Sequence, residues 1–106
     1  MTDKFLADPA RILKDNPNGG AGMIAAVRDL LVSNPQTLQA IIGLFSSANA
    51  AQDAAAGTGL GQAAQAGLVS NPAYAAEMQQ QLAASLHEPA ILAFATVMGE
   101  EPIEAR

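Results

Sequence analysis

The apolar residues of this chain recur at the spacing of α-helices along most of its length. Two segments, residues 35–55 and 72–86, each carry one apolar stripe at intervals of three and four residues, which predicts helices with one buried face. The stripes consist of Leu38, Ile41, Ile42, Phe45 and Ala48 in the first segment and of Ala75, Met78, Leu82 and Leu86 in the second. Residues typical of strands are scarce, so the pattern predicts an all-α fold.

Proline preceded by Asp or Asn marks three helix starts, at Asp8-Pro9, Asn34-Pro35 and Asn71-Pro72. The polar side chain can accept a hydrogen bond from a free backbone N–H, and proline suits the first helical turn because it has no N–H to leave unsatisfied. Gly57-Thr58-Gly59 predicts a loop, with Thr58 as the cap of the next helix. We therefore expect a small bundle of about five to six short helices, over residues 8–14, 22–32, 35–55, 60–69, 72–86 and 89–98.

The pentapeptide Leu-Val-Ser-Asn-Pro occurs twice, at residues 31–35 and 68–72. The copies are 37 positions apart, and residues 22–35 align with residues 59–72. Each copy predicts a short helix, a corner at Ser-Asn-Pro and a longer second helix. This order is typical of a duplicated helical hairpin, which buries its face against the neighbouring copy. Chance recurrence of a common Asn-Pro corner explains the same letters, so both interpretations remain open.

Length and composition predict one domain spanning residues 1–106, since a chain of this size can enclose a single modest core. Within it we expect a short helix and a Gly-rich loop over residues 1–20, and a flexible acidic tail over residues 99–106. Alanine accounts for 24 residues and aromatic side chains for only four. Because alanine forms helices readily and contributes little buried area, the helices should pack closely around a thin core.

Charged residues are few, at 14% of the chain, and they are unevenly distributed. Residues 30–105 contain six acidic residues and no Lys or Arg. Binding to nucleic acid requires cationic groups, and an anionic membrane surface repels an acidic protein. No apolar run approaches the roughly 20 residues of a membrane span, and residues 1–20 show no secretory signal. The sequence therefore predicts a cytoplasmic protein with no nucleic-acid partner and no membrane span.

Residues that could carry out chemistry are sparse. The chain has no cysteine and one histidine, His87, which lies at a predicted helix C-terminus and is expected to interact there with the helix dipole. No nucleophile motif surrounds any serine, and the acidic residues of the tail lack the spacing of a calcium loop. We therefore expect no catalytic residues, no metal site and no cofactor, and a small hydrolase is the least favoured function.

The segment 89–98 is the candidate partner-binding site, because it is apolar on every side. Such a helix is either central in its domain or shared with another chain, and a domain this small has little room for an enclosed helix. The candidate residues are Ile91, Leu92, Phe94, Val97 and Met98. At about 100° per residue, the first, third and fifth of these share one side. We expect that side to pack on Leu82 and Leu86, and we expect Leu92 and Val97 to face a second chain or a partner.

Three segments, DPARILKDNP (8–17), NPQTLQAII (34–42) and NPAYAAEMQQQL (71–82), resemble the Asp-Pro/Asn-Pro helical repeats of co-chaperones and ubiquilin-type proteins. The resemblance implies a hydrophobic groove that holds helices of client proteins. The glycine-rich corners and the alanine runs depart from the pattern of those repeats. The resemblance therefore serves as an analogy for a helical groove.

These features together predict a non-catalytic helical protein–protein interaction module, such as an adaptor, an inhibitor or an accessory subunit, that acts through an apolar helix face. Its partner would be another protein or a second copy of the chain. The alternative is a structural subunit of a larger assembly, such as a virion or a multi-protein complex. The surface of such a subunit is covered by its neighbours and therefore needs few solvating charges.

Overall fold

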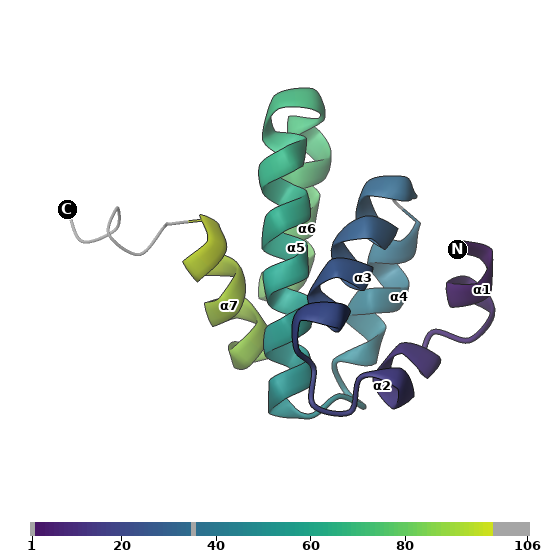
Figure 1. Cartoon of the computed structure of the whole chain (residues 1–106). Helices are drawn as coiled ribbons and strands as arrows, with labels where there is room; N and C mark the ends of the chain where they lie inside the picture. Colours follow the sequence, from purple (N-terminus) through teal and green to yellow (C-terminus); the bar gives the residue numbers. More distant parts are fainter. Residues whose placement is uncertain (1, 35, 99–106) are drawn as a thin grey trace.

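The computed structural model describes residues 2–34 and 36–98, and over these residues it confirms the predicted all-α fold. The helices are α1 (Thr2–Ala7), α2 (Arg11–Asp15), α3 (Ala21–Ser33), α4 (Thr37–Leu44), α5 (Ala50–Ser70), α6 (Pro72–Ser85) and α7 (Glu88–Met98). In Figure 1 the long helix α5 stands in the middle of the bundle, with α7 on one side and α3 and α4 on the other. The tail predicted over residues 99–106 lies outside the described residues.

Helix α5 is the central element, and glycines open two of its sides to close neighbours. Gly59 faces α3, where an added Cβ would lie 2.8 Å from Cβ of Val27. Gly61 faces α7, where an added Cβ would lie 2.7 Å from Cβ of Val97. Residues two apart on a helix point about 200° apart, so α3 and α7 approach α5 from opposite sides.

Gly57 lets α7 come still closer to α5. A Cβ added there would overlap the backbone carbonyl of Ala90, a residue with no exposed surface (0%). A backbone carbonyl cannot swing aside as a flexible side chain does, so a larger residue at this position would have to move α7 itself. Gly57 and Gly61 are four residues apart, so they lie on the same face of α5 and together form the surface on which α7 packs.

The core forms where large side chains from the surrounding helices pack against alanines. Four alanines of α5 are buried, namely Ala55, Ala56, Ala63 and Ala64. The largest fully buried hydrophobic side chains are Phe45, Met23, Leu31, Ile41, Leu60, Met78, Leu82 and Val27. Only one of these, Leu60, belongs to α5, and all lie in one cluster with the alanines. The small side chains of α5 thus allow the other helices to approach it closely, and those helices contribute most of the buried apolar area.

The single helix predicted over residues 35–55 is wrong, because the structure divides it into α4, a turn over residues 45–49 and the start of α5. A capping box at Asn49 starts α5. Asn49 Oδ1 accepts a hydrogen bond from Gln52 N at 2.8 Å, and Gln52 Oε1 accepts one from Asn49 N at 2.9 Å. The buried Gln52 also donates to the carbonyls of Leu13 and Asn16, which ties α2 and the chain that follows it to α5.

The predicted loop at Gly57-Thr58-Gly59 is also wrong, since α5 runs through it without a break. Thr58 caps no helix there, and its Oγ1 instead donates to the carbonyl of Ala54 at 3.0 Å. Glycine inside an isolated helix costs about 1 kcal/mol relative to alanine. In this chain the same glycines permit the contacts with α3 and α7, so tertiary packing overrides the local preference.

The two Ser-Asn-Pro corners each contain an equivalent backbone hydrogen bond. Asn34 N donates to the carbonyl of Leu30 at 3.0 Å, and Asn71 N donates to the carbonyl of Gly67 at 2.6 Å. These donors and acceptors are equivalent positions in the two copies of the repeated segment. The predicted order of a short helix and then a longer one is wrong in both copies, because α4 is shorter than α3 and α6 is shorter than α5. The two copies also differ from each other in length, with α3 and α4 both shorter than α5 and α6. The duplicated hairpin therefore stays a hypothesis.

Capping at the three predicted helix starts is confirmed at only one of them. Asn71 is the N-cap of α6, where its Oδ1 accepts a hydrogen bond from Tyr74 N at 3.2 Å. Asn34 is not an N-cap, because its Oδ1 accepts from Gln36 N inside the turn that precedes α4. Asp8 is not one either, since α2 begins three residues later and has no side-chain cap.

We expect Gly57→Ala to lower the free energy of unfolding by about 1–3 kcal/mol, because the new methyl group would push α7 away from α5. Gly43→Ala is the matched control, since this glycine is also helical but an added Cβ meets nothing within 4 Å. The control should stabilise the protein by up to about 1 kcal/mol through helix propensity alone. Urea denaturation followed by circular dichroism measures both changes. Equal effects of the two substitutions would contradict the close contact between α5 and α7.

Candidate interaction surface

One face of α7 packs on α5. Ala90 has no exposed surface and Phe94 is 3% exposed, while Val97 lies against Gly61. These residues are four and three positions apart, which places them on one side of the helix. Ile91 is partly buried at the edge of the same core. The inner side of α7 is therefore part of the fold.

The predicted division of α7 into an inner and an outer side is wrong for Val97, which lies against α5 instead of facing outward. The predicted packing on Leu86 is also wrong, because Leu86 is 83% exposed. Helix α7 lies mainly on α5, since the glycines of α5 allow a closer approach than α6 does. Leu92 does face outward and is 61% exposed, and the side chain of Met98 lies outside the described part. A partner for any of the candidate residues stays a prediction.

Leu86 combines a left-handed backbone with an exposed apolar side chain. It ends α6 with φ 61° and ψ 21°, and it is the one non-glycine residue with positive φ among the described residues. This conformation costs a leucine about 1 kcal/mol or more, and glycine is the residue usually found at such a helix end. The helical stripe Ala75, Met78 and Leu82 is buried as predicted, and it stops one turn before Leu86 because α6 ends at Ser85.

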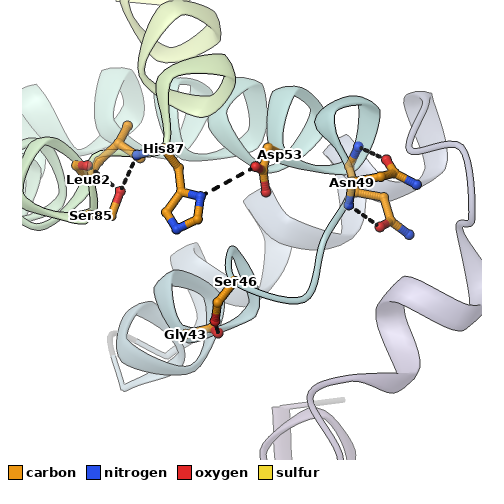
Figure 2. Close-up of polar contacts among 8 residues, drawn as sticks. Gly43, Ser46, Asn49, Asp53, Leu82, Ser85 and His87 are labelled. Atoms are coloured by element: carbon orange, nitrogen blue, oxygen red, sulfur yellow. Dashed lines mark hydrogen bonds and ion pairs between the residues drawn. The ribbon is translucent and has the colours of Figure 1, made fainter.

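Figure 2 shows the side chains that hold the chain on both sides of Leu86. Ser85 Oγ donates to a carbonyl of the last turn of α6 at 2.6 Å and accepts from His87 N at 3.4 Å. His87 Nδ1 lies 3.6 Å from Oδ2 of Asp53 on α5. The imidazole also packs at a tilt on Phe45, with ring centroids 5.5 Å apart. The structural role expected for His87 thus involves the carboxylate of another helix.

Asp53 is held in a poor environment for a charge. Its side chain is 8% exposed, and its Oδ1 accepts no hydrogen bond from any described residue. Removal from water raises the pKa of Asp53, and the neighbouring His87 opposes that shift. The contact with His87 therefore fastens the corner between α6 and α7 to α5 and leaves one carboxylate oxygen without a partner.

The paired Asp53 and His87 share one element with hydrolase sites, so nearby hydroxyl groups matter. Ser85 Oγ donates a hydrogen bond to a carbonyl of α6, and Ser46 Oγ donates one to the carbonyl of Gly43 at 3.2 Å. No described serine or threonine hydroxyl is hydrogen-bonded to the imidazole of His87. The described residues also contain no group of three His, Cys, Asp or Glu side chains placed to hold a metal ion. The contacts of His87 position a corner of the fold.

A second apolar feature escaped the sequence analysis, an open groove of about 580 Å³ at α1, α2 and α3. Its lining consists of Phe5, Ala7, Asp8, Arg11, Ile12, Asp15, Ala26 and Leu30. The rim carries an exposed ion pair, Arg11 Nε to Asp15 Oδ2 at 3.7 Å. The residue that could have indicated this groove in the sequence is Phe5. It lies in α1, a helix that was not predicted as a separate element.

Comparison of the chain with protein-family models, with curated proteins and with solved structures finds no match. The likeness of the Asn-Pro segments to co-chaperone repeats therefore receives no support from a family match. Within the described residues, no helix has both the length and the apolar character needed to cross a membrane.

We expect Leu86→Gly to raise the free energy of unfolding by about 0.5–1 kcal/mol, because glycine adopts the left-handed conformation without steric cost. The increase is smaller than the strain removed, since glycine also gains freedom in the unfolded chain. Thermal melts of the two proteins measure the difference. A lower melting temperature for the variant would show that the leucine side chain stabilises the fold.

We expect Asp53 to make the stability fall as the pH rises, the opposite of a carboxylate whose pKa is lowered in the folded state by an ion pair. Its pKa is raised in the folded state above the ordinary value of 3.8, so its contribution to stability is fully present below that value. The contribution is lost as the pH rises through the folded-state pKa. The unfolding free energy of the natural chain minus that of Asp53→Asn should therefore fall as the pH increases from about 3 to 7. Glu88→Gln controls for the loss of one negative charge, and parallel curves for the natural chain and Asp53→Asn would contradict this account.

Proposed function

We propose that this protein is a non-catalytic helical interaction module that binds a protein partner through the outer side of the segment from Leu86 to Leu92. The observation that carries the proposal is the exposure of these two leucines, 83% and 61%, at a corner of the fold that is otherwise tightly held. Exposed apolar side chains that lie together on an ordered frame can form the core of a protein–protein interface.

Rigidity of the frame supports this proposal. The inner side of α7 is fixed on the glycines of α5, and the preceding corner is fixed by Ser85 and by the contact of His87 with Asp53. A surface that is already ordered loses little conformational freedom when it binds a partner. The cytoplasmic location and the lack of a nucleic-acid partner remain predictions that rest on the sequence.

A structural subunit of a larger assembly is the second candidate, and the low surface charge favours it. Between residues 36 and 98, the exposed charged side chains are Glu77 and Glu88, while Asp53 is buried. A surface with so few charges suits a subunit that is covered by its neighbours. Regular self-assembly of the purified chain would favour this candidate, and a stable monomer would favour the interaction module.

The discriminating experiment compares the natural chain with Leu92→Asp. Light scattering after size-exclusion chromatography reports self-association, and a pull-down from the native source reports partners. We expect the substitution to abolish partner binding and to leave the helicity by circular dichroism unchanged, because Leu92 lies outside the core. Gln79→Asp, at an exposed position of α6, is the control for an added charge. Identical partner binding by the natural chain and Leu92→Asp would remove α7 from the proposal. Unfolding of Leu92→Asp would show that the leucine side chain is needed for the fold.

A further inference from the structure

We infer that the corner formed by Leu86, Glu88 and Leu92 recognises a basic amphipathic helix of a partner protein. This inference rests on the proposed interaction function and adds the chemical class of the partner. Three observations carry it, namely the backbone of Leu86, the spacing of the two exposed leucines, and the distribution of charge around them.

Leu86 has the properties of a pre-positioned anchor. It occupies a left-handed position that glycine would fill with less strain, and its side chain is 83% exposed and therefore contributes little to the core. The strained conformation is held by hydrogen bonds on both sides, from Leu86 N to the carbonyl of Ala83 and from His87 N to Ser85 Oγ. A leucine kept exposed and in a fixed position at the expense of local stability is expected where that side chain has a binding role.

Leu86 and Leu92 are close enough for one helix to contact both. Two residue steps separate Leu86 from the start of α7 at Glu88, and four helical steps separate Glu88 from Leu92. The maximum Cα separation of the two leucines is therefore about 14 Å, from about 3.8 Å per step and about 1.5 Å of rise per helical residue. Two to three turns of a partner helix span that distance.

The charge near these leucines is negative. Glu88 is exposed and lies four residues before Leu92, so the carboxylate and the leucine share the outer face of α7. From Leu30 to Ala105 the sequence contains no Lys or Arg. Arg28 is on α3, which packs against the opposite side of α5. The other described Lys and Arg residues, Lys4, Arg11 and Lys14, are on α1 and α2, which Figure 1 shows on the far side of α3 from α7. Lys or Arg beside the apolar stripe of a partner would therefore complement Glu88.

A second copy of the chain fits this corner less well. In a symmetric dimer the same patch meets itself, so two Glu88 carboxylates would come together at an interface with no compensating cation from residues 30–105. A basic helix from a different protein meets the apolar and the electrostatic requirement at once.

The test is a selection from a displayed library of 18-residue helical peptides. Apolar residues are fixed at positions i, i+3, i+4 and i+7, and Lys, Glu, Gln and Ser are randomised at the remaining positions. We expect selection on the intact natural chain to enrich Lys strongly over Glu. The enriched peptides are then synthesised, and their affinities are measured by fluorescence anisotropy.

Three variants and one matched control locate the binding site. Leu86→Gly and Leu92→Ser should each weaken binding of the enriched peptides about tenfold. Glu88→Gln should weaken it about threefold and reduce its dependence on salt. Val32→Ser should have no effect on peptide binding. It removes an apolar side chain that is as exposed (62%) as that of Leu92 but lies at the end of α3. Leu86→Gly is the sharpest variant, since it is expected to fold more stably while binding less tightly.

Each other outcome counts against the inference. Enrichment of neutral or acidic peptides that still require Leu86 and Leu92 would overturn the basic partner and leave the interaction module in place. No enrichment, or equal binding to the natural chain and both leucine variants, would overturn recognition of a helix at this corner. If the natural chain still captured a partner in the pull-down and Leu92→Asp did not, the interaction module would stand with a partner of another kind.

Discussion

The close contact between α5 and its neighbours is the constraint on which the rest of the structure depends. Gly59 admits α3 on one side, and Gly57 and Gly61 admit α7 on the other. A side chain at any of these positions would meet Val27, Ala90 or Val97 at less than the distance that carbon atoms tolerate. Because alanines and glycines make α5 thin, a chain with few aromatic residues can still close its core around that helix.

The same contact sets the geometry of the corner between α6 and α7. Once Ala90 lies against Gly57, the chain has only Leu86 and His87 in which to turn from one helix into the next. The turn leaves Leu86 in a left-handed conformation and brings His87 to Asp53. Both features are locally unfavourable, one through backbone strain and the other through a buried carboxylate. The packing of α7 on α5 offsets their cost, and the result is an exposed leucine in a fixed place.

The surface shows how stability and interaction are divided along this chain. The inner sides of α3 and α7 belong to the fold, whereas Leu86 and Leu92 add little buried area to it. The groove beside α1 and α2 is a separate apolar feature on the side of α3, away from α7. Exposed charge is sparse on the residues between α4 and α7. A protein of this kind relies on a few apolar side chains and on an ordered frame for recognition, and its charge tunes which partners approach.

The sequence by itself determined the all-α class, the position of α3, α6 and α7 to within one residue at most ends, and the cap at Asn71, because helical spacing and Asn-Pro capping act over only a few residues. Local signals also singled out the segment 89–98 as the candidate site, and Leu92 is exposed there as expected. Tertiary structure alone decided that Gly57-Thr58-Gly59 is helical, that Val97 faces inward and that Leu86 is exposed. It also brought Asp53 to His87, a pair separated by 34 residues. The physical reason is the same in each case: a glycine, a valine or a carboxylate carries no information about the helix that will pack against it, and that contact decides its conformation and exposure.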